Sequence, residues 1–215
     1  MQQTKKVCTQ ARRALGAIFR LFRGVCPLYV LERVYSGVVL PQMLYAIEVW
    51  FPGTSKWQTK LENVQRFFLQ QHQNNYLQTY SELLQANNLT STSPLCPMWL
   101  SAAQRGMELF YRFYYRLRFC PEDVLTAPRG RQSDRLNHGC AVGMTARTVT
   151  TASTFFPSCA KVWNSLPRNV PVLGATAFKL FCRSNEFVDV LHQLSSSHYL
   201  YYLKFCWPNL FDTFM

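Results

Sequence analysis

A chain of 215 residues with 48% hydrophobic and 16% charged residues can bury a sizeable core without metals or disulfides, which argues against intrinsic disorder. The charge is one-sided, because 23 Lys and Arg face 11 Asp and Glu and give a formal net charge of +12 at pH 7. A polyanion is therefore the first partner to expect, although a basic surface without a partner has the same composition.

The first expected element is an amphipathic helix over residues 4–23. Its apolar residues recur at steps of three and four, and its arginines lie mostly off that stripe. Up to Tyr35 the sequence holds seven basic residues and one acid, Glu32. The candidate nucleic-acid contacts of this helix are Lys5, Lys6, Arg12, Arg13 and Arg20.

The following segments also favour helices. An apolar stretch at 28–51 is broken by Pro41, which fits two helices or one kinked helix. A third helix is expected from Ser55 to about Gln71, after a Pro-Gly turn signal. A short helix at 81–86 and a polar loop at 87–97 then precede an aromatic helix over residues 98–119.

The aromatic helix carries a second basic group, Arg105, Arg112 and Arg116. Their steps of seven and four predict a common helix face. Such a face would follow a phosphate backbone while nearby tyrosines stack on unpaired bases. A solvated helix face with its rings in the core fits the pattern as well.

After Thr126 the helical pattern stops. A Gly-containing stretch with Arg129, Arg131, Arg135 and Arg147 predicts either a basic arm that orders on a charged partner or a plain exposed loop. Short strands are expected near 140–142 and 146–149.

A compact segment follows at 155–166. The helical pattern then returns at 176–194, with Thr176 as its cap. The aromatic end, 197–215, fits a docked tail, an anchor on a membrane surface, or a sequence without selected structure.

Residues for catalysis are sparse. Two-metal phosphoryl transfer needs clustered carboxylates, and the one adjacent acidic pair, Glu122 and Asp123, fits a helix cap better. No phosphate-binding loop or nucleophile elbow occurs. We therefore expect no catalytic residue in this chain, and no stand-alone enzyme.

Metal sites, secretion and membrane spans are not expected either. The eight cysteines are scattered singly and do not combine with the four histidines at zinc-ligand spacing. The N-terminus lacks the apolar core of a signal peptide, so reduced thiols in an intracellular protein are expected. No run approaches the roughly 20 apolar residues of a transmembrane helix.

Five motifs then coincide in order: LERVYSGVVLPQMLYAIEVW at 31–50, LENVQRF at 61–67, RQSDRLNHG at 131–139, RTVTTASTFFPSCAKVWNSLP at 147–167 and TAFK at 176–179. Over residues 5–194 the chain resembles the region behind the polymerase palm of non-LTR retrotransposon reverse transcriptases. Ser158 stands where the family usually has Arg. The most specific block consists of Phe155, Phe156, Pro157, Trp163, Asn164, Leu166 and Pro167.

The resemblance implies a helical thumb that grips template–primer RNA or DNA for a palm encoded elsewhere or lost, and Mg²⁺ is expected only in that palm. The fold class expected is mainly α, within α+β. A thumb-like bundle at 1–125 would precede a basic arm or linker at 126–146, a smaller mixed module at 147–196 and the tail at 197–215.

Two functions remain open from the sequence. The first is a fragment of an RNA-directed DNA polymerase that binds or positions template–primer nucleic acid. The second is a noncatalytic remnant or a repurposed protein-interaction module. In both, the VWNSLP residues are expected to build core rather than to catalyse, because Trp163 and Leu166 offer large apolar areas.

Overall fold

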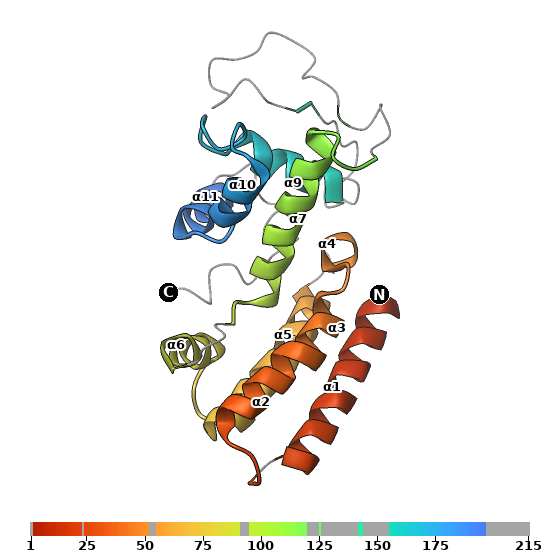
Figure 1. Ribbon diagram of the computed structural model, residues 1–215, viewed down its shortest axis with the longest axis vertical. Coiled ribbons are helices and arrows are strands. Elements are labelled where there is room, and N and C mark those ends of the chain that lie inside the picture. Colours follow the sequence, from red (N-terminus) through yellow and green to blue (C-terminus); the bar gives the residue numbers. More distant parts are fainter. Residues whose placement is uncertain are drawn as a thin grey trace. The chain divides into compact units, whose positions relative to one another are not determined.

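The computed structural model is helical (Figure 1) and describes residues 2–22, 24–51, 55–90, 95–119, 125, 142–143 and 155–196. The mainly α class is confirmed, and no strand occurs among these residues. The strands expected at 140–142 and 146–149 fall almost entirely outside them, as do the arm and the aromatic tail. The described chain divides into two compact units between Ala102 and Ala103.

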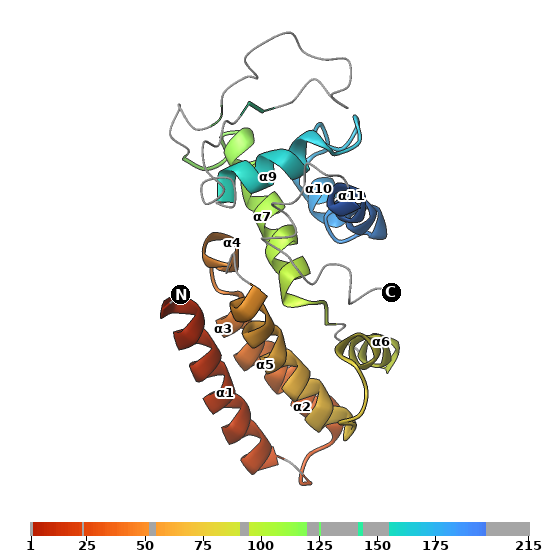
Figure 2. The ribbon, with the colours of Figure 1, turned by 180° about the vertical axis from the view of Figure 1, so that it is seen from behind.

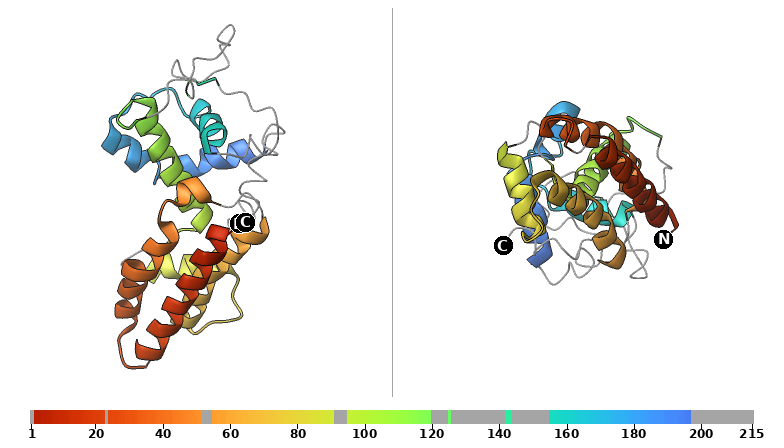
Figure 3. Two further views of the ribbon diagram at one scale, coloured as in Figure 1. Left: turned by 90° about the vertical axis from the view of Figure 1, so that its right-hand side faces the viewer. Right: turned by 90° about the horizontal axis from the view of Figure 1, so that it is seen from below.

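The first unit is organised around α1 (Gln2–Phe22), which confirms the first predicted helix. Its apolar stripe is buried at Val7, Ala11, Leu15 and Ile18. This stripe packs against α5 (Ser55–Gln73) and against the helical run of residues 28–44. The views in Figures 1, 2 and 3 agree that these helices run side by side.

The stretch that contains Pro41 forms one helical run rather than two helices. It consists of α2 (Leu28–Val34), a π-helical turn η1 (Tyr35–Val39) and α3 (Leu40–Leu44). The N–H of Leu40 donates to the C=O of Tyr35, five residues back. Because proline has no N–H, the wider π turn directly before it accommodates the missing bond. The chain breaks only at Ala46, at a φ of 50°, before α4 (Ile47–Trp50).

Helices α5 and α6 (Tyr80–Thr90) are both longer than the sequence predicted. Asn74 directly follows the last residue of α5, and its φ of 50° suits asparagine at a helix C-terminus. The N–H of Thr79 donates to Glu82 Oε2 over 2.8 Å, so Thr79 and Glu82 begin α6 as a capping box. The prediction of a loop from residue 87 is wrong for residues 87–90, which belong to α6.

The second unit contains the later part of α7 (Met98–Tyr114), α9 (Phe155–Asn164), α10 (Ala175–Phe181) and α11 (Asn185–Ser196). The expected single helix at 176–194 is wrong, because a turn at 182–184 separates α10 from α11. Gly174 rather than Thr176 occupies the N-cap of α10. The predicted helix over 98–119 is too long at its C-terminal end.

Candidate nucleic-acid interface

The outer face of α1 is positively charged. Its Lys and Arg side chains are exposed and α1 contains no acid, so nothing on the helix itself neutralises them. Lys6, Arg13 and Arg20 follow one another at steps of seven residues, which places them in a row about 10 Å apart along the helix. The predicted residues brought together here are Lys5, Lys6, Arg12, Arg13 and Arg20.

Helix α5 adds two cations that sequence reasoning missed, Lys56 and Lys60, both exposed. Burial raises the pKa of the Cys8 thiol, and the positive charges of Arg12 and Lys60 act in the opposite direction. One cation from α1 and one from α5 therefore act on the same thiol. The ammonium of Lys60 also lies 4.5 Å from the centre of the Trp57 ring. We call the five α1 residues together with Lys56 and Lys60 the cationic face.

Most acids of residues 1–102 are at least partly buried. Only four occur between residues 1 and 102. Glu32 and Glu62 are buried, Glu48 is half-buried, and the exposed Glu82 is engaged in the cap of α6. The cations of α1, together with Lys56 and Lys60, are by contrast exposed, so the described surface of this unit is more positive than its composition indicates.

Glu62 binds protein groups on each of its oxygens. Oε2 accepts from the Tyr80 hydroxyl at 2.7 Å and from the N–H of Met98 at 3.1 Å, and Oε1 accepts from the N–H of Trp99 at 3.0 Å. Burial raises the pKa of Glu62, and these hydrogen bonds partly oppose that shift. The role of Glu62 is therefore structural, because its side chain holds the start of α7 and Tyr80 of α6 against α5.

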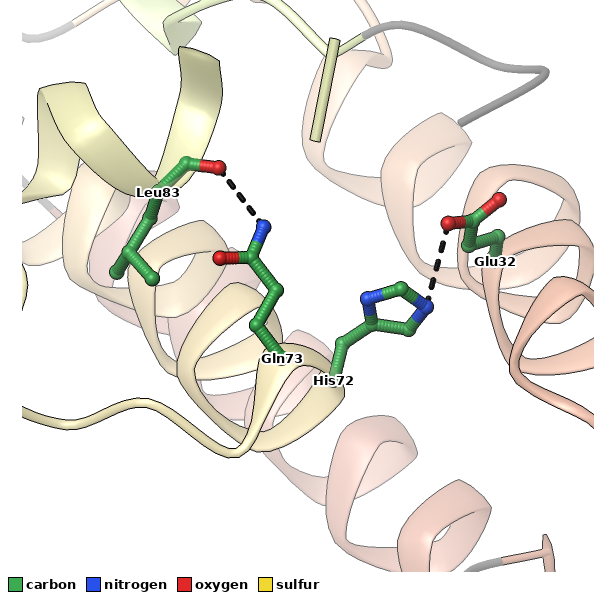
Figure 4. A network of polar contacts seen from close by, with 4 residues as sticks. All are labelled: Glu32, His72, Gln73 and Leu83. Atoms are coloured by element: carbon green, nitrogen blue, oxygen red, sulfur yellow. Dashed lines mark hydrogen bonds and ion pairs between the residues drawn. The ribbon is translucent and has the colours of Figure 1, made fainter. Parts of the chain in front are cut away.

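A second buried polar contact lies at the other end of α5 (Figure 4). His72 Nε2 lies 3.2 Å from Glu32 Oε1 of α2, and the ring of His72 stacks on Phe68. Its neighbour Gln73 donates to the C=O of Leu83 in α6 over 2.9 Å. Consecutive residues of α5 thus tie it to two different helices. Among the described residues, no three His, Cys, Asp or Glu side chains group together to hold a metal.

The second unit brings together only part of the basic group predicted on α7. Arg105 and Arg112 lie on α7 and are exposed. Arg116 is also exposed, but it has left the helix at a φ of 51°, so a stripe of three arginines on one helix face is wrong. The remaining candidates, Arg129, Arg131, Arg135 and Arg147, lie outside the described residues.

Within the VWNSLP block, the prediction of core is confirmed for Trp163 and Leu166. Trp163 and Leu166 are fully buried, and rings from α7 and α10 pack around Trp163: Phe110, Tyr111, Tyr114 and Phe178. Of the other residues of the resemblance's most specific block, Pro157 is buried, Phe155 and Phe156 are half-buried, and Pro167 is exposed.

Asn164 and Ser165 both bond backbone groups through their side chains. Ser165 does so, through the C=O of Lys161 at 3.1 Å. Asn164 instead reaches 22 residues back, where it accepts from the N–H of Val142 and donates to the C=O of Val142, each at 2.9 Å.

Comparisons with known proteins add no assignment. Protein-family models, curated proteins and solved structures all give no match to the chain. In the described part of the chain, no helix has both the length and the apolar character needed to cross a membrane.

Proposed function

We propose that this chain binds template–primer nucleic acid as a fragment of an RNA-directed DNA polymerase of the non-LTR retrotransposon type. The observation that carries this proposal is the cationic face, combined with the inward or engaged position of the first unit's acids. Catalysis belongs to a palm encoded elsewhere or lost. The role proposed for the described residues is to grip the duplex.

The length of the row formed by Lys6, Arg13 and Arg20 on α1 matches the spacing of phosphates along a nucleic-acid strand. From Lys6 to Arg20 the helix rises about 21 Å, which corresponds to roughly six nucleotide steps at about 3.4 Å each. Every phosphate neutralised by Lys or Arg releases condensed counterions, so binding must weaken as salt rises. If Lys6, Arg13 and Arg20 each contact one phosphate, together they contribute about 2.7 to the steepness with which log affinity falls against log salt concentration.

The test measures binding of a fluorescent RNA–DNA hybrid of about 20 base pairs across a salt series. The variant combines Lys6→Gln, Arg13→Gln and Arg20→Gln. Its matched control removes three exposed cations that lie off α1: Arg33→Gln, Arg168→Gln and Lys179→Gln. We expect the α1 variant to bind at least about tenfold more weakly, with a salt slope shallower by about 2.7, and the control to change far less. Equal losses in both, or no binding by the unchanged chain at low salt, refute the proposal.

A second candidate function, a protein-interaction module, is favoured by one observation. Leu21, Val25, Leu28 and Tyr29 are all more than half exposed where α1 passes into α2. Exposed apolar clusters of this kind commonly mark interaction sites. This function predicts self-association in sedimentation, and nucleic-acid retention that salt does not weaken.

A further inference from the structure

The chain turns sharply where α7 ends. The N–H of Arg116 donates to the C=O of Phe113 over 3.1 Å, and the N–H of Leu117 donates to the C=O of Arg112 over 2.8 Å. With the positive φ of Arg116, these two bonds form a Schellman motif. Residues 117–119 therefore leave the helix axis and are not covered by the next turn of α7.

The side chains at this turn are unusually open for their types. Phe119 is 91% exposed and Leu117 is 61% exposed. Tyr115 is 38% exposed. Its hydroxyl donates to the C=O of Pro171 and its ring tilts against Tyr111, so these contacts cover part of the side chain. The turn thus presents one highly exposed aromatic ring, Phe119, and a second ring, Tyr115, that is held in place by its contacts.

Cations alternate with these apolar side chains. Arg112, Arg116 and Arg118 are exposed, and none of them forms an ion pair with a carboxylate of the described residues. The nearest acid along α7, Glu108, lies 4.0 Å from Arg183 of the second unit. The segment is therefore positive as well as aromatic.

We infer that residues 112–119 form a subsite for unpaired nucleotides, in which Phe119 stacks on a base and the three arginines contact the phosphates beside it. This inference rests on the nucleic-acid binding proposed above and specifies that this subsite takes single-stranded nucleic acid. In a duplex, the faces of the bases are hidden in the stack. In an unpaired strand, accessible base faces alternate with phosphates, and this segment likewise alternates aromatic rings with guanidinium groups.

The experiment compares a fluorescent oligo(dT) and an oligo(rU) of about 15 nucleotides with the RNA–DNA hybrid used above. Phe119→Ala should weaken binding of both single strands by about 5- to 100-fold and binding of the hybrid by less than about twofold. Phe119→Trp should retain binding, whereas Phe119→Leu should lose it, because leucine keeps the apolar area but has no π face. Tyr76→Ala is the matched control, since Tyr76 is an exposed aromatic residue without a neighbouring cation in sequence.

Photocrosslinking of an oligonucleotide that carries 5-iodouracil should label residues 115–119. The subsite is overturned if Phe119→Ala binds the single strands like the unchanged chain or if Phe119→Leu retains binding. It is overturned as well if the chain binds phosphatidylserine vesicles through Phe119 instead of oligonucleotides. Binding of the hybrid without binding of single strands removes this subsite alone, whereas binding of neither removes the proposed function and the subsite with it.

Discussion

The hydroxyl of Tyr80 donates to Oε2 of Glu62 over 2.7 Å and joins α6 to α5 in the interior of the first unit. The same carboxylate accepts the N–H groups of Met98 and Trp99, where α7 begins. Three helices therefore meet at one buried acid. A carboxyl group in such a place is tolerated only because several donors replace its water.

Removing this acid should destabilise the first unit. Glu62→Ala leaves three buried donors without their acceptor, and we expect a loss of about 3 kcal/mol in the free energy of unfolding. Tyr80→Phe removes one of the three hydrogen bonds to the Glu62 carboxyl group and should cost about 1.5 kcal/mol. Urea denaturation measures both values. Glu82→Ala, at the exposed cap of α6, is the control, and a larger loss there than at Glu62 would refute the central role of Glu62.

The raised pKa of Glu62 also predicts the direction of a pH dependence. The ordinary value is 4.5, and burial raises the pKa above it in the folded chain. Between these two values the folded state holds a proton that the unfolded state has lost, so the free energy of unfolding falls as pH rises through that window. Glu62→Gln cannot ionise, and the contribution of this site should vanish. Parallel curves of stability against pH for Glu62→Gln and the unchanged chain would contradict this assignment.

Apolar periodicity in the sequence was enough to predict α1 and α5, because a buried stripe at steps of three and four leaves a regular mark. The buried polar row of α5 left no such mark. All four polar residues of this row, Gln58, Glu62, Gln65 and His72, are buried, whereas the pattern of an amphipathic helix predicts polar residues on the exposed face. Their position follows from α2, α6 and α7 covering more than one face of α5, which depends on contacts distant in sequence.

The same contrast holds for the candidate sites. The exposed cations of α1 could be predicted, because charged side chains opposite an apolar stripe face water. The end of α7 could not, since the left-handed position of the Schellman motif usually holds glycine and here holds Arg116. The block around Trp163 was predicted as core from its size and apolar area. The bonds from Asn164 to Val142 depend on tertiary structure alone.

Arg116→Gly should stabilise the second unit. A residue with a Cβ in the left-handed region costs about 1 kcal/mol or more, and glycine does not incur that cost. We therefore expect a gain of about 1 kcal/mol in the free energy of unfolding, seen as a higher urea midpoint with an unchanged slope. Arg116→Ala removes the same charge but keeps the Cβ, so its stability should stay near that of the unchanged chain. Both variants should weaken oligonucleotide binding equally, which separates the charge from the backbone conformation.

Asn164 should hold the backbone of Val142 in place. Its side-chain amide makes one bond to the N–H of Val142 and one bond to its C=O, each at 2.9 Å, much as a neighbouring strand would. Asn164→Ala leaves both backbone groups without these partners, and we expect a loss of about 2 kcal/mol with faster hydrogen exchange at the Val142 amide. Asn164→Asp keeps an acceptor for the N–H but cannot donate to the C=O, so it should protect that amide while still destabilising the unit. Ser165→Ala, which removes only a local bond to Lys161, should leave exchange at Val142 unchanged. If Asn164→Ala leaves it unchanged as well, the amide pairing does not hold Val142 in solution.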